Sequence, residues 1–107
     1  MATQQPLYAI LEEPTFRDDC RYINPNPLAF DTLFFALKEL LERDPWKASH
    51  ALGDDTDIRY VRSREHFAVD DMPAMYVTLR IEGAPPDGTV TLRRVVMEAD
   101  LRAGLHL

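Results

Sequence analysis

The sequence has little of what would assign a chain to a specialised class of protein. Of its 107 residues only one is cysteine and four are glycine, and no apolar run approaches the ~20 residues that a membrane span needs. The single thiol, Cys20, cannot form an internal disulfide and has no second thiol with which to hold a metal. The N-terminus also lacks a basic region followed by an apolar stretch. We therefore expect one soluble, cytoplasmic domain over residues 1–107.

A basic excess is missing as well. The chain carries 12 Lys+Arg and 18 Asp+Glu, a formal charge of -6, which excludes a general coat for nucleic acid. The acidic excess lies entirely in residues 1–58, whereas residues 59–107 are neutral and have arginine as their only basic side chain apart from histidine. Since the planar fork of arginine suits phosphate and carboxylate, the second half can still hold a local phosphate site. The alternative is that these arginines pair with nearby carboxylates on a solvated sheet face.

The common sequence motifs of cofactor and metal sites do not occur. There is no glycine-rich phosphate loop, no HExxH, no CxxC and no GxSxG. The three histidines are scattered, and the acidic stretch 54–57 lacks the spacing of a calcium-binding loop. We expect no metal and no cofactor.

One helix is clearly predicted, over residues 27–44. Pro27 suits the first helical position, and the chain leaves the helix at Asp44-Pro45 because proline cannot continue the hydrogen-bond ladder. Its apolar residues recur at steps of three and four and form one stripe: Phe30, Leu33, Phe34, Leu37, Leu40 and Leu41. The preceding residues 14–26 contain several prolines and asparagines, so we expect an irregular segment there.

Strands are predicted on both sides of this helix. A short first strand covers residues 8–12, and residues 58–98 contain antiparallel strands. Residues 75–82 alternate with a period of two, as expected when one face is buried. In the following strand the apolar phase slips by one at Arg93-Arg94, which predicts a β-bulge that keeps both apolar pairs on the core face. The predicted fold is α+β, an antiparallel sheet of about four strands with one main amphipathic helix on one face.

Phe35 does not fit the amphipathic pattern. At about 100° per residue it falls on the charged side of the helix, roughly opposite the apolar stripe. We therefore consider two alternatives. Either the chain itself covers this ring, with residues 14–26 or with the residues after Trp46, or the ring contacts a partner.

The order of elements resembles that of a known family. A first strand, the segment FRDD, a helix ending in LLERDP, then RYVR, PAMYVTLRI and VTLRRVV resemble the RelE/ParE superfamily of toxins from bacterial toxin-antitoxin pairs. The resemblance covers about residues 8–98. It implies a sheet with helices on one face, either ribosome-dependent mRNA cleavage or gyrase inhibition, and a cognate antitoxin. Tyr76 stands where the family usually has arginine, and Leu79 where it has tyrosine.

A nuclease of this kind needs no metal. A base takes the proton of the ribose 2′-hydroxyl, an acid protonates the leaving oxygen, and arginines stabilise the charge of the transition state. The candidates here are Arg59, Arg62 and Arg80 for the phosphate, and Tyr76 or His66 for proton transfer.

Two classes of function follow. The first is a RelE/ParE-like toxin, or a catalytically degenerate homologue, that acts on mRNA at the ribosome or on gyrase, as a metal-independent endoribonuclease if it is an enzyme. The second is a non-enzymatic acidic binding module, of the immunity or adaptor type, that holds a basic protein partner. The candidate partner-binding residues are Phe35, Arg93 and Arg94, and a homo-oligomer is compatible with either class.

Overall fold

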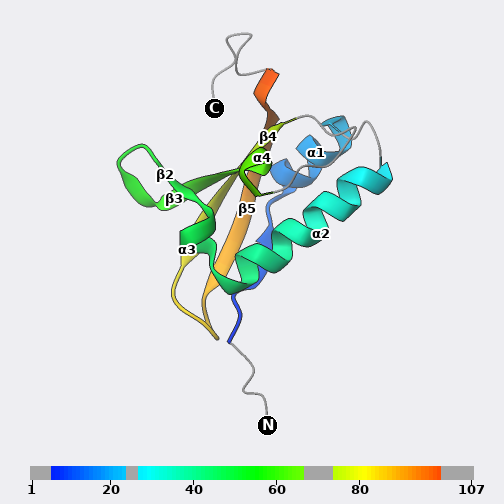
Figure 1. Ribbon diagram of the computed structural model, residues 1–107. Coiled ribbons are helices and arrows are strands. Elements are labelled where there is room, and N and C mark those ends of the chain that lie inside the picture. The colour runs from blue at the N-terminus through cyan, green and yellow to red at the C-terminus, as the bar shows by residue number, and fades with distance from the viewer. Residues whose placement is uncertain (1–5, 24–26, 67–73, 100–107) are drawn as a thin grey trace.

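The computed structural model describes residues 6–23, 27–66 and 74–99, and it contains a five-stranded sheet with helices packed on one face (Figure 1). The strands are β1 (Ala9–Glu12), β2 (His50–Leu52), β3 (Asp55–Arg62), β4 (Met75–Glu82) and β5 (Thr89–Met97). The helices are α1 (Pro14–Ile23), α2 (Pro27–Arg43), α3 (Pro45–Ala48) and α4 (Ser63–His66). The predicted α+β class is confirmed. Within the described ranges, no helix has both the length and the apolar character needed to cross a membrane.

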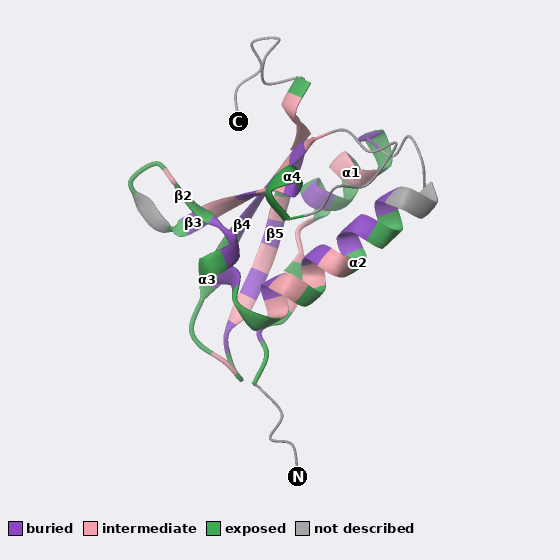
Figure 2. Cartoon of the chain, in the orientation of Figure 1, coloured by how far each residue is buried: buried purple, intermediate pink, exposed green. Residues whose placement is uncertain are grey.

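The helix α2 forms as predicted and supplies much of the core. Five residues of its apolar stripe are buried, while Leu40 is partly buried against them. The buried five are Phe30, Leu33, Phe34, Leu37 and Leu41. Figure 2 shows buried positions along α2 and along the strands behind it. The helix ends at Arg43, after which Asp44 caps α3 by accepting a hydrogen bond from the Lys47 backbone.

The β-bulge predicted at Arg93-Arg94 is confirmed. Thr78 of β4 pairs with Arg94, whereas the next residue, Leu79, pairs with Leu92, so Arg93 is the extra residue. The bulge allows Val90, Leu92 and Val95 all to be buried in the core. A regular strand would have turned one of the two apolar pairs toward the opposite face.

The sheet differs from the predicted one in strand number and direction. Its order is β1-β5-β4-β3-β2, and β1 pairs with β5 in parallel, so the sheet is mixed. The additional strand, β2, has only three residues, too few to show a period of two. The parallel pairing could not be predicted from local sequence because β1 and β5, although neighbours in the sheet, are the first and last strands along the chain.

The prediction of an irregular segment at residues 14–26 was wrong for residues 14–23, which form α1; residues 24–26 lie outside the described residues. Pro14 begins this helix, a position where its missing N–H costs nothing. Only Phe16, Cys20 and Ile23 of its ten residues turn toward the core. Their spacing of four and three is helical, but three residues are too few to stand out among the charges of the segment.

The helix α1 takes the place of β1 along the edge of β5. Pairing between β1 and β5 ends at Leu92. Beyond it, side chains of α1 form hydrogen bonds with the backbone groups of β5. Thr15 donates a hydrogen bond to the Arg93 carbonyl at 2.9 Å. The carboxylate of Asp19 accepts from the Val95 backbone N–H at 3.1 Å and from Arg94 at 2.7 and 3.1 Å. The described part of this edge is therefore covered rather than left free to pair with another chain.

Candidate functional site

The face of the sheet opposite the helices, here called the open face, carries the candidate site. On β4 the residues Met75, Val77, Leu79 and Ile81 are buried under the helices, so the alternate residues point the other way. Strand register places the following side chains of the three central strands on the open face: Ile58, Tyr60, Arg62, Tyr76, Thr78, Arg80, Glu82, Thr89, Thr91, Arg94 and Val96.

Three side chains of this face are joined by hydrogen bonds, and we call Arg62, Tyr76 and Glu98 the Arg-Tyr-Glu cluster. Arg62 and Tyr76 are direct cross-strand partners. The Nε of Arg62 donates to Oε1 of Glu98 at 3.0 Å, and the Tyr76 hydroxyl donates to the same oxygen at 3.2 Å. The hydrogen bond with Glu98 raises the pKa of Arg62 and keeps it cationic. The side chains of Arg62 and Glu98 are 33% and 18% exposed, so a ligand on the open face can reach both.

A row of rings extends from the cluster to the sheet edge, and we call His50, Tyr60 and Tyr76 the aromatic row. The ring centroids of Tyr60 and Tyr76 are 5.7 Å apart, and those of His50 and Tyr60 are 5.3 Å apart. His50 is also 2.8 Å from the carboxylate of Glu65 in α4. This hydrogen bond lowers the pKa of Glu65, which favours the charged carboxylate beside the row.

Of the other arginines on or near this face, two pair with carboxylates and one does not. Arg94 is held by Asp19, as described above, and Arg93 lies 3.6 Å from Glu13. Arg80 is exposed and makes no hydrogen bond or ion pair with any residue in the described ranges. Its guanidinium is available to an anionic ligand.

Arg59 is separated from the other predicted phosphate-binding residues. Register pairs it with Leu79, which places it on the helix face of the sheet. Its guanidinium donates to the hydroxyl and carbonyl of Ser49, both at 2.7 Å, and lies 4.9 Å from the centre of the Trp46 ring. Arg59 therefore fixes the chain after α3 and does not contribute to the open face.

His66 and Phe35 also lie away from the open face. The Nε2 of His66 is 2.9 Å from the Ala48 carbonyl, so the proton-transfer candidate that remains on the open face is Tyr76. Phe35 is 69% exposed on α2, so its ring remains available to a partner. Among the described residues, no group of three His, Cys, Asp or Glu side chains is placed to hold a metal ion.

Sequence reasoning missed three members of this region, namely Glu98, His50 and Glu65. Glu98 follows directly on β5, and its backbone N–H donates a hydrogen bond to the carbonyl of Ala74, the residue before β4. Counting the register through the bulge could have placed it near Tyr76. His50 and Glu65 meet only through the short elements β2 and α4, for which the sequence has no periodic signal.

The surroundings of Cys20 disfavour the thiolate form that a nucleophilic role needs. Burial first, and then the charges of Glu12 and Asp19, raise the pKa of its thiol to about 11. The thiol is therefore protonated at neutral pH.

Comparisons of the chain with protein-family models, with curated proteins and with solved structures found no match.

Proposed function

We propose that the protein is a RelE/ParE-like toxin, or a catalytically degenerate homologue of one, whose open face binds single-stranded mRNA. The observation that carries the proposal is the convergence of Arg62, Tyr76 and Glu98 on a sheet face that the described helices leave uncovered. The helices on one face of the sheet agree with what the resemblance to the superfamily implies. The remaining support comes from the chemistry of the residues around the cluster.

The aromatic row suits the bases of a single strand. Rings on a sheet surface stack unpaired bases, and each stacked base contributes about 1 to 3 kcal/mol with little preference for sequence. Two tyrosines and a histidine in one row offer this surface. Arg80 lies on the same face without a carboxylate partner in the described chain and can neutralise a phosphate. The overall charge of -6 does not prevent this because the contact is local.

The Arg-Tyr-Glu cluster offers the parts of a metal-independent cleavage. Glu98 accepts the proton of the ribose 2′-hydroxyl as O2′ bonds to phosphorus. Arg62, held beside that carboxylate, stabilises the negative charge of the phosphorane-like transition state. The Tyr76 hydroxyl gives its proton to O5′ as the bond from phosphorus to O5′ breaks. The products are a 2′,3′-cyclic phosphate and a free 5′-hydroxyl.

The test uses the purified chain with a labelled single-stranded RNA, in EDTA without ribosomes and, separately, with the RNA bound to ribosomes. We expect the wild-type protein to bind RNA in the first mixture and to cleave it in the second. Glu98→Gln should lower the cleavage rate by about a hundredfold or more, as expected for loss of a general base, while RNA binding persists. Arg17→Ala, a change to an exposed arginine of α1, is the matched control and should leave both binding and cleavage unchanged.

A second assay separates binding from catalysis. Tyr60→Ala should weaken RNA affinity by about 1 to 3 kcal/mol, and Arg80→Ala should weaken it and reduce its dependence on salt. A degenerate homologue will show these binding losses with no cleavage by the wild-type chain. If RNA does not bind, or if it binds equally well to the Tyr60 variant, the proposal is wrong. Inhibition of DNA supercoiling with RNA left intact would instead identify gyrase as the target.

A further inference from the structure

The outer surface of α2 has an apolar centre within an acidic rim, and we call Asp31, Phe35, Glu39 and Glu42 the acidic face of α2. With about 3.6 residues per turn, the three carboxylates lie within about 40° of Phe35 around the helix axis. Phe35 is 69% exposed, and Asp31 and Glu39 are exposed as well. Within the described part of the chain, none of the three carboxylates forms an ion pair.

The one lysine on this side of the helix does not neutralise the rim. Lys38 extends toward β1, where its Nζ lies 2.6 Å from the carboxylate of Glu12. The charged side chains of α2 within about 40° of Phe35 are therefore all acidic, and Arg43 lies about 80° away around the helix axis. A ring that is exposed among carboxylates without counter-ions matches a partner that brings both an apolar contact and positive charge.

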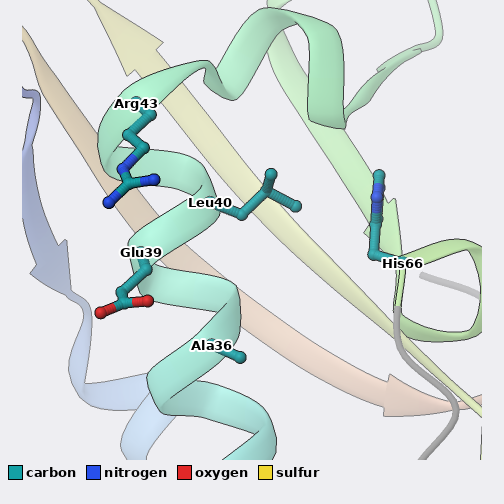
Figure 3. Close-up of a pocket in the computed structure, with 5 residues that line it drawn as sticks. All are labelled: Ala36, Glu39, Leu40, Arg43 and His66. Atoms are coloured by element: carbon teal, nitrogen blue, oxygen red, sulfur yellow. The ribbon is translucent and has the colours of Figure 1, made fainter.

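A pocket lies beside α2, on a different side of the helix from Phe35. It has a volume of about 320 Å³ and is lined by Ala36, Glu39, Leu40, Arg43 and His66. Figure 3 shows Ala36 and Leu40 pointing from α2 toward His66, with Glu39 and Arg43 on the other side of the helix. Glu39 lies at the border between the acidic face and the pocket, whose apolar residues Ala36 and Leu40 are about 100° and 140° around the helix axis from Phe35. The pocket therefore opens on a different side of α2 from the acidic face.

We propose that the acidic face of α2 docks a basic amphipathic helix of a partner protein. A second copy of the chain is a poor occupant because a two-fold contact would place the acidic rim against itself. A basic helix instead brings lysine or arginine to the three carboxylates and a leucine-like side chain to Phe35. The surface lies on the opposite side of the sheet from the open face, so the two can be occupied together.

The test is a selection of helical peptides. A phage library of 16-residue amphipathic helices, randomised in charge, is selected on the wild-type chain and depleted on Phe35→Ala. We expect the peptides that depend on Phe35 to be basic with one or two apolar anchors. Phe35→Ala should weaken them by about tenfold or more, as expected when a large buried contact is lost. Tyr22→Ala, which removes an aromatic ring that is 85% exposed on α1, is the matched control and should have no effect.

A variant with reversed charges on the acidic face provides the second test. The triple variant Asp31→Lys, Glu39→Lys and Glu42→Lys should lose the basic peptides and bind acidic versions of them. Neutral or acidic peptides as the Phe35-dependent binders of the wild-type chain would overturn the proposal, as would a failure to enrich any. A wild-type dimer that Phe35→Ala converts to a monomer would also overturn it in favour of a second copy. Each readout is independent of RNA binding, so a failure here is distinct from a failure of the proposed function.

Discussion

The carboxylate of Asp19 should be a main determinant of stability at the edge of the sheet. It accepts three hydrogen bonds, one from the Val95 backbone and two from Arg94, and its side chain is only 18% exposed. Replacing it by alanine leaves the partly buried Val95 N–H without an acceptor, which costs about 1 to 3 kcal/mol. The Arg94 side chain is 56% exposed, so its share is discounted to at most about 1 kcal/mol for solvent screening. We expect Asp19→Ala to lower the free energy of unfolding by about 2 kcal/mol.

Urea unfolding followed by circular dichroism measures this loss. Asp19→Asn keeps an oxygen for the Val95 N–H but removes the charge, so its loss should be about half that of the alanine variant. Asp18→Ala is the control because its side chain is 72% exposed and pairs only with the exposed Arg21, and it should change stability by less than about 0.5 kcal/mol. Equal losses for the Asp18 and Asp19 variants would refute the role given to α1 as the cover of this edge.

Three further outcomes can be measured on the same protein. Leu41→Ala removes a fully buried side chain and should cost about 2 to 5 kcal/mol in urea unfolding, whereas Leu11→Ala, at a site 50% exposed, should cost far less. Because burial and neighbouring carboxylates raise the pKa of Cys20 from 9.0 to about 11, alkylation at pH 8 should be about a hundredfold slower in folded than in urea-unfolded protein; equal rates contradict this. His50→Ala should raise the pKa of Glu65 toward its ordinary value in an NMR titration, since their hydrogen bond is the first cause of its depression; an unchanged pKa would show that another group is responsible.

Local patterns in the sequence were sufficient for the elements with long periodic signals. The stripe of α2 and the alternation of β4 predict both elements closely, and the phase slip at Arg93-Arg94 predicts the bulge. Of the short elements, β1 was predicted, whereas β2, α3 and α4 were missed because their three or four residues carry no period. The helix α1 was missed for a different reason, since its charges hide an inward face of only three residues.

The candidate site was only partly predictable for related reasons. Strand phase places Tyr76 and Arg80 on one face, and antiparallel pairing then brings Arg62 beside Tyr76. The same phase puts Arg59 on the other face, where Ser49, directly after α3, and Trp46 of α3 are its partners. Glu98 depends on a register that passes through the bulge, and His50 depends on a three-residue strand. Each missed residue is brought in by a contact between segments distant in the sequence.

The parallel pairing of β1 with β5 has a consequence for how the chain folds during synthesis. Thr15 and Arg93, which meet where β1 gives way to α1, are 78 positions apart in the sequence. Since the entropy of closing such a loop must be offset before these contacts form, the pairing is expected to be a late, slow step. On the ribosome β1 cannot find its neighbour until β5 has emerged. A nascent chain that stops after β4 would leave β4 with an unpaired edge, and such edges bind other chains readily.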